Sequence, residues 1–201
     1  MKTMAEIYTV RLFGDPVLRK RALKVTDFSE IPRLAENMLE TMFEARGVGL
    51  AAPQVGLSQR LFVWAEYLDS EEDEEEGEDA DLRTRVRETH VMVNPVITFR
   101  EGQQVGTEGC LSIPGLYSEN VPRDLRVRVE YQDERGEPKV YEAEGYSAVV
   151  IQHELDHLDG VLYFERLPKE LKAQWLEDNR EDLARFQKQA KAFLKELKAK
   201  G

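Results

Sequence analysis

The chain has 201 residues, of which 41% are hydrophobic and 33% are charged, and it contains one cysteine. This length suits a single domain over residues 1–201 with a real hydrophobic core, and one cysteine argues against a disulfide-stapled secreted fold. The start lacks the long apolar stretch of a signal peptide and no segment approaches membrane-spanning length, so we expect a cytoplasmic protein without a membrane partner.

The first predicted element is a helix that faces the core. Apolar residues recur at helical spacing over residues 31–43, after Ser29, a good N-cap, and before Gly47, a good helix stop. Strands are predicted next at residues 60–66 and 90–99.

An acidic run separates these two strands. Residues 69–81 hold ten acidic side chains and no basic one, and without them the net charge changes from −11 to −1. Such a run repels itself and buries nothing, so it is predicted to be a solvated loop. We favour a tolerated surface insertion over the alternative, an acidic interaction arm or cation trap.

The second half of the chain predicts a hairpin, a buried helix and a terminal helix. Alternating apolar residues at 127–131 and a turn at 133–136 lead into a second strand at 139–144. Residues 148–151 are apolar on all sides, which indicates a central buried helix. After Pro168 a long amphipathic helix is predicted to form a C-terminal extension over residues 168–201, with these inner positions: Leu171, Trp175, Leu183, Phe186, Phe193, Leu194 and Leu197. The predicted fold is therefore α+β, with antiparallel sheets around a buried central helix and a long C-terminal helix.

The buried helix carries a metal motif. Residues 153–157 read His-Glu-Leu-Asp-His, an H-E-x-x-H pattern. On a helix, His153 and His157 point from one face into one coordination sphere. Glu154 then lies beside them, where it can contact a metal-bound water without being a ligand. Two histidines rarely hold a catalytic metal alone, so a third protein ligand is needed.

Three residues are candidates for that third ligand. Tyr163 stands at the last position of the metzincin pattern, but a phenol is a poor ligand. Glu177 would complete a His₂Glu site like that of thermolysin. Cys110 would supply a thiolate, the strongest of the three for a soft or borderline cation. It could equally be a buried free cysteine that packs as a small hydrophobic residue, so the residues alone leave the choice open.

A third segment adds a resemblance. Residues 47–54 read Gly-Val-Gly-Leu-Ala-Ala-Pro-Gln, in which two glycines permit close backbone approach and a glutamine offers an amide donor. Together with residues 108–112 and 152–157, in this order, the segment closely resembles the three motifs of peptide deformylases. The resemblance extends from residues 11–19 to about Arg166.

This resemblance implies a set of roles at the site. The metal ligands would be Cys110, His153 and His157, and Glu154 would be the general base. The side-chain amide of Gln54 and the backbone N–H of Leu111 would stabilise negative charge on the carbonyl oxygen. The implied reaction removes the formyl group from the N-terminal formylmethionine of newly synthesised polypeptides and releases formate.

The implied substrate-binding residues lie beside the metal ligands. Val48, Gly49 and Leu50 would pair with the extended substrate as an added strand, with Gly49 permitting close approach. Gly109 and Val150 complete the set; Val150, or its neighbour Val149, would line an apolar methionine pocket, although packing within the helix explains them equally well.

Metal identity and partners are further expectations. A Cys-His₂ set suits Zn²⁺ and accepts Fe²⁺, Co²⁺ and Ni²⁺. The resemblance implies Fe²⁺ in the cell, with Zn²⁺, Ni²⁺ or Co²⁺ in purified protein. Residues 186–201 hold five lysines and one acid, so this helix could contact ribosomal RNA, although lysines are also favoured at a helix C-terminus by its dipole. We expect N-formylmethionyl nascent peptides as partners, no DNA partner, and a monomer; the ribosome is a further candidate partner, slightly less favoured than the dipole explanation of the lysines.

Two other functions are compatible with the helix motif. An H-E-x-x-H metallopeptidase would use Glu177 and leave Cys110 free, and a non-catalytic metal-stabilised binding module would be expected to lose Glu154 or Gln54.

Supporting contacts are predicted around the metal ligands. Glu108 and Arg123 are predicted to form a buried ion pair that braces the cysteine loop. Asp156 is predicted either to orient a ligand histidine or to face solvent. His90 is not expected to be a ligand.

Overall fold

The computed structural model describes residues 4–68 and 81–201, so the predicted acidic loop lies outside the described residues except for Asp81. The helices are α1 (Ile31–Glu44), α2 (Tyr146–Leu158), α3 (Lys169–Asp178) and α4 (Arg180–Lys200). The strands are β1 (Gly49–Ala51), β2 (Leu61–Tyr67), β3 (Val86–Glu101), β4 (Gln104–Cys110), β5 (Ile113–Arg123), β6 (Arg126–Gln132) and β7 (Pro138–Glu144). Short 3-10 turns are η1 (Pro16–Arg19), η2 (Ala52–Val55), η4 (Leu82–Arg85) and η5 (Tyr163–Arg166).

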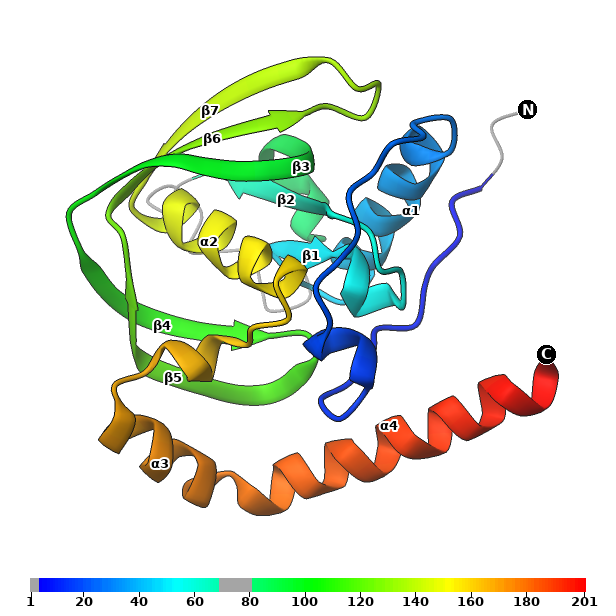
Figure 1. Ribbon diagram of the computed structural model, residues 1–201, viewed down its shortest axis with the longest axis vertical. Coiled ribbons are helices and arrows are strands. Elements are labelled where there is room, and N and C mark those ends of the chain that lie inside the picture. Colours follow the sequence, from blue (N-terminus) through cyan, green and yellow to red (C-terminus); the bar gives the residue numbers. More distant parts are fainter. Residues whose placement is uncertain (1–3, 69–80) are drawn as a thin grey trace.

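The strands form two antiparallel sheets. Five strands pair in the order β1-β2-β3-β6-β7, and β4 pairs with β5 as a separate two-stranded ribbon. The long strand β3 changes partner along its length, from β2 before Val93 to β6 after it, and the pairing shifts register at that point. Figure 1 shows how the sheet and the ribbon enclose α2. The predicted α+β class with antiparallel sheets around a central helix is confirmed.

The core consists of three clusters, one of which contains residues of α2. The first packs α1 against β1 and β2, and the second packs α2 against the opposite face of the large sheet. The third packs β5 and η5 against α3 and α4. Ala148, Ile151 and Leu158 of α2 are completely buried. The helix that carries the metal motif is therefore fixed by contacts on all sides, which limits the movement of its side chains.

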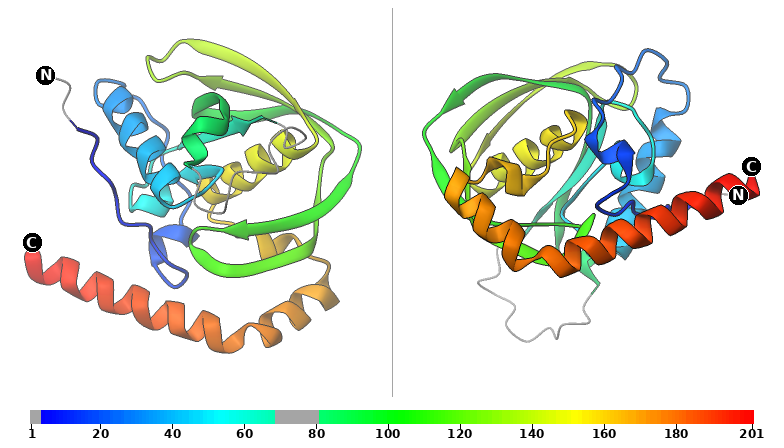
Figure 2. Two further views of the ribbon diagram at one scale, coloured as in Figure 1. Left: turned by 180° about the vertical axis from the view of Figure 1, so that it is seen from behind. Right: turned by 60° about the horizontal axis from the view of Figure 1, so that its bottom comes forward.

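The predicted C-terminal helix is two helices. The helix is interrupted at Asn179, whose side-chain amide donates to the backbone carbonyl of Trp175 at 2.8 Å. Asparagine is a poor helix former because its side chain competes for backbone hydrogen bonds. Trp175 is buried as predicted, as are two of the expected inner residues of α4, whereas Leu171 and Leu197 are 42% and 40% exposed. Figure 2 shows that α3 and α4 lie along one side of the molecule and are inclined to each other.

The N-cap of helix α1 lies one residue later than predicted. It is Glu30, which makes no side-chain cap hydrogen bond with the described residues, and the backbone N–H of Ser29 donates to the side chain of Asp27. Among the described residues, no helix is both long enough and apolar enough to span a membrane.

Candidate active site

The ribbon and the central helix bring three potential metal ligands together. Cys110 ends β4, while His153 and His157 lie on α2, and their side-chain sulfur and nitrogen atoms lie within 4.8 Å of one another. Cys110 Sγ is 3.3 Å from His157 Nε2. A tight turn to Ile113 of β5 holds the cysteine in this position.

The donor set of this cluster fits a divalent metal ion. One thiol and two imidazoles are ligands that Zn²⁺, Fe²⁺, Co²⁺ and Ni²⁺ accept. Burial holds the pKa of His157 well below its usual value, so this ring is neutral and has a lone pair to offer. The contact between Cys110 and His157 is already close to the spacing of two ligands on one ion.

The other two candidates for the third ligand lie elsewhere. Tyr163 donates its hydroxyl to the carbonyl of Leu116 at 3.0 Å, and its ring stacks on His153 at 6.0 Å between centroids. Glu177 is exposed on α3 and does not belong to the cluster. His90 lies outside the site, stacked on Trp64, where it forms a second His/Glu group with Glu66 and Glu88.

Glu154 is buried beside the histidines with an unused acceptor. The residue is 3% exposed, and its Oε2 atom has no hydrogen-bond partner among the described residues. Burial is the main cause that raises the pKa of Glu154 to about 7. A Cβ atom on Gly49 would lie 2.5 Å from Glu154 Oε1. The missing Cβ of Gly49 therefore leaves room for this carboxylate, a close approach that the sequence did not predict.

Gln54 presents its amide to the cysteine. Its Oε1 accepts from the backbone of Ala51 at 2.9 Å, and its Nε2 lies 3.2 Å from Ser112 Oγ and 3.5 Å from Cys110 Sγ. These contacts fix which end of the amide faces the site. Ser112 is completely buried, and its part in orienting Gln54 was not predicted. Its place two residues after Cys110, within residues 108–112, was the available signal.

A pocket of about 430 Å³ opens over these groups. It is lined by most of the predicted site residues, namely Val48, Gly49, Gln54, Gly109, Cys110, Leu111, Val150, His153 and Glu154. Val149 of α2 also lines it, as do Tyr117 and Tyr146. Leu50 does not line the pocket, because its side chain is completely buried in the core cluster with α1. Only its backbone, in edge strand β1, is placed for the predicted pairing with the substrate.

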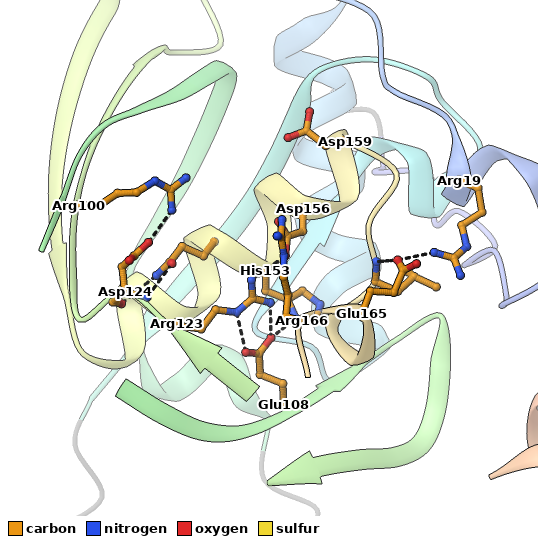
Figure 3. Close-up of polar contacts among 12 residues, drawn as sticks. Arg19, Arg100, Glu108, Arg123, Asp124, His153, Asp156, Asp159, Glu165 and Arg166 are labelled. Atoms are coloured by element: carbon orange, nitrogen blue, oxygen red, sulfur yellow. Dashed lines mark hydrogen bonds and ion pairs between the residues drawn. The ribbon is translucent and has the colours of Figure 1, made fainter. Parts of the chain in front are cut away.

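A network of ion pairs supports His153 (Figure 3). Arg123 donates to both oxygens of Glu108 at 2.8 Å, which confirms the predicted buried pair. Glu108 Oε1 also lies 2.7 Å from His153 Nδ1. Burial opposes ionisation of Glu108, but Arg123 and His153 outweigh it, so the pKa of this carboxyl is lowered.

The solvent-facing alternative predicted for Asp156 is wrong, and the residue does not contact a ligand histidine directly. It is 6% exposed, so it does not face solvent, and it binds Arg123 and Arg166 in place of a histidine. The reason is that Glu108 already occupies His153 Nδ1, while Asp156 points toward η5. Arg166 was not predicted as part of the site.

The fold and this site define a class of protein, a metal-dependent hydrolase in which an H-E-x-x-H helix faces a cysteine. The family model described as Polypeptide deformylase matches residues 7–173. The chain belongs to the peptide deformylase family, as the sequence motifs indicated, and a metallopeptidase that uses Glu177 is not favoured.

Similar proteins cover almost the whole chain. A peptide deformylase of Thermus thermophilus is 65% identical over 191 residues, which are 95% of this chain and 98% of the relative. One of Thermotoga maritima is 45% identical over 163 residues, or 80% and 87% of the two chains.

Solved structures agree with these relatives. The crystal structure of a peptide deformylase from Thermus thermophilus has a TM-score of 0.82 and 60% identity, and the match covers 92% of this chain and 99% of that one. The structure of a peptide deformylase from Synechococcus elongatus in complex with actinonin has a TM-score of 0.69 and 37% identity, covering 87% and 91%.

Proposed function

We propose that this enzyme hydrolyses the formyl amide at the N-terminal formylmethionine of newly synthesised polypeptides and releases formate. The observation that carries the proposal is the meeting of Cys110, His153 and His157 with the buried carboxylate of Glu154 at the pocket. The amide of Gln54 faces the same cluster. A water activator, a proton acceptor and an oxyanion donor are the groups that amide hydrolysis requires.

Cys110, His153 and His157 would hold one divalent metal ion. When bound, the ion supplies Lewis-acid chemistry, which makes water a better nucleophile and polarises a carbonyl group. We propose Fe²⁺ in the cell and Zn²⁺, Ni²⁺ or Co²⁺ in purified material. Ferrous iron oxidises in air whereas Zn²⁺ has no redox chemistry, so the ferrous enzyme should lose activity on prolonged aeration while a zinc-loaded sample keeps its own level. Equal persistence of the two would contradict the choice of iron.

Glu154 would move the proton. Its unpartnered Oε2 is free to accept a proton from the attacking water, and a pKa of about 7 suits both uptake and release near neutral pH. Attack of the water forms the new C–O bond and places negative charge on the carbonyl oxygen; the C–N bond then breaks as Glu154 returns the proton to the departing α-amine. Nε2 of Gln54 and the backbone N–H of Leu111 would donate to the carbonyl oxygen as its negative charge develops.

The substrate would lie along the free edge of β1. This strand is at the end of the sheet order and pairs with β2 on one side, which leaves the backbone of residues 48–50 available for strand addition. The methionine side chain would enter the apolar part of the pocket at Val149 and Val150, which are 8% and 5% exposed. A formyl carbon carries only hydrogen, so a narrow site would admit it and exclude a bulkier acyl carbon.

The direct test is formate release from formyl-Met-Ala-Ser by the metal-loaded protein. Glu154→Gln should lower kcat by several orders of magnitude while metal content is kept, and an acetylated Met-Ala-Ser should not be cleaved. Equal rates for Glu154→Gln and the unsubstituted enzyme would refute the mechanism. Actinonin, present in the Synechococcus complex, should compete with the formyl peptide.

We also propose that α4 docks on the ribosome and that the enzyme is a cytoplasmic monomer. Its lysines Lys188, Lys191, Lys195 and Lys198 are exposed, while Phe186 is buried and anchors the helix. Changing the four lysines to glutamine should weaken co-sedimentation with ribosomes and leave hydrolysis of a short formyl peptide intact. A four-arginine variant is the matched control, and unchanged sedimentation of the glutamine variant would contradict docking. Light scattering tests the monomer.

A further inference from the structure

A line of alternating charges runs from turn η5 to the metal-site histidine. We call the four residues Arg166, Asp156, Arg123 and Glu108 the brace; His153 lies at its inner end (Figure 3). They come from four different elements, since η5, α2, β5 and β4 each contribute one. Every contact between neighbours in the brace is a hydrogen-bonded ion pair.

The contacts of the brace fix orientation as well as charge. Arg166 holds both oxygens of Asp156, with Nε 3.1 Å from Oδ2 and Nη2 2.7 Å from Oδ1. Asp156 Oδ2 in turn accepts from Arg123 Nη1 at 2.6 Å. Arg123 reaches Glu108 with two further bonds, and Glu108 contacts His153 Nδ1. An imidazole that donates from Nδ1 keeps its Nε2 lone pair for a metal.

The net charge buried in the brace depends on Arg166, the residue at its outer end. The side chains of Arg123, Glu108 and Asp156 are only 4%, 4% and 8% exposed, whereas that of Arg166 is 47% exposed. With Arg166 the brace is neutral; without it, one net negative charge stays buried. A second cavity of about 290 Å³ is lined by Arg123, Asp156 and Arg166, so water could enter where the guanidinium had been. Arg123 would then be drawn toward Asp156 and away from Glu108.

We infer that Arg166 is a positioning residue for the metal site, acting on His153 through Asp156, Arg123 and Glu108. The inference rests on the proposed function, in which His153 is a metal ligand. Arg166 lies outside the substrate pocket. It would nevertheless control the orientation of the His153 ring and how firmly that ring is held toward the metal.

Arg19 provides a matched comparison. It also ties η5 to the rest of the molecule, through an ion pair of 2.5 Å with Glu165, and its side chain is 41% exposed. Within the described part of the chain, Arg19 forms no ion pair with a residue of the brace. Arg19→Gln therefore loosens η5 without disturbing the brace, whereas Arg166→Gln does both.

The test uses the Co²⁺-loaded full chain in four forms: unsubstituted, Arg166→Gln, Arg166→Lys and Arg19→Gln. The visible ligand-field spectrum reports the geometry of the ligands, and transfer of the ion to a chelator gives its dissociation rate. Arg166→Gln should shift the spectrum and speed dissociation on the order of 10-fold, the lower end of what loss of an outer partner costs. Arg166→Lys keeps the charge but loses the two-point contact, so it should be intermediate. Arg19→Gln should match the unsubstituted protein.

Two results would overturn the inference: an unchanged spectrum and dissociation rate in Arg166→Gln, or the same shift in Arg19→Gln. If Arg166→Gln does not fold, Arg166→Lys decides, because values equal to those of the unsubstituted protein exclude a positioning role. Failure of the proposed function is seen separately, since the unsubstituted protein would then bind no Co²⁺ or release no formate.

Discussion

Replacing Gly49 with alanine should disable the enzyme by displacing Glu154, the proposed general base, without direct loss of a substrate contact. The new Cβ would lie 2.5 Å from Glu154 Oε1 and 2.9 Å from the Cγ and Cδ atoms of the same side chain. Ordinary contact at this glycine begins near 3.4 Å, so the carboxylate must retreat by about 0.9 Å. Because a misplacement of about 1 Å can cost about 10²-fold in rate, kcat should fall by about that factor, or about 2.7 kcal/mol of barrier.

The assay is steady-state formate release from formyl-Met-Ala-Ser at several concentrations, with metal content measured on the same samples. Gly49→Ala should lower kcat while KM changes little, because the methionine pocket is untouched. Gly106→Ala is the matched control, since a Cβ there meets no atom within 4 Å. If Gly49→Ala keeps a kcat within threefold of the control at equal metal content, the close packing of Gly49 on Glu154 does not matter for catalysis.

Three other substitutions separate the roles of the site residues. Cys110→Ser should lower the bound metal below one ion per chain, because an alcohol is a weaker ligand than a thiolate. Glu177→Gln should leave the metal content at one ion per chain. Elemental analysis after dialysis measures both, and the reverse pattern would support a peptidase-like site. Arg123→Leu should cost about 3–5 kcal/mol in urea unfolding, because Glu108 loses its arginine and Asp156 keeps only one of its two. Arg126→Gln, which breaks exposed pairs, should leave the urea midpoint almost unchanged, and equal destabilisation by the two substitutions would contradict this reasoning. Tyr163→Phe should cost about 1 kcal/mol for its lost hydrogen bond yet keep the metal, and loss of the ion would make the phenol a ligand.

Most of the secondary structure could be predicted from the periodic spacing of apolar residues. The helix predicted over residues 31–43 is α1, Ile31–Glu44, and the predicted hairpin is β6 and β7, because in both cases the apolar residues repeat at the period of the element. The break at Asn179 was missed because the amphipathic pattern continues across it in both directions. The break has a local cause, because the side-chain amide of Asn179 competes for the backbone hydrogen bonds of the helix. Such a competition cannot be recognised from the spacing of apolar residues.

Among the supporting contacts at the site, the pair between Glu108 and Arg123 was predicted correctly. Glu108 belongs to the cysteine segment, so its pairing with Arg123 was expected, and the structure shows it. The contacts of Asp156 and Arg166 depend on where η5 lies against α2 and β5, which no local pattern specifies. Leu50 shows the same limit, because motif membership says nothing about which side of a strand faces the core.

The position of the ligand cluster between core clusters has a thermodynamic consequence. Cys110 packs in the cluster formed by β5, η5, α3 and α4, whereas the neighbours of the histidines in α2 belong to the cluster with the large sheet. An ion held by all three side chains is therefore a ligand of the folded state that links two parts of its core. At a free concentration about 1,000 times its dissociation constant it would add about 4 kcal/mol to the free energy of unfolding. Scarcity of the ion would then act on abundance as well as on turnover, because more of the chain would be unfolded and open to proteolysis at any moment.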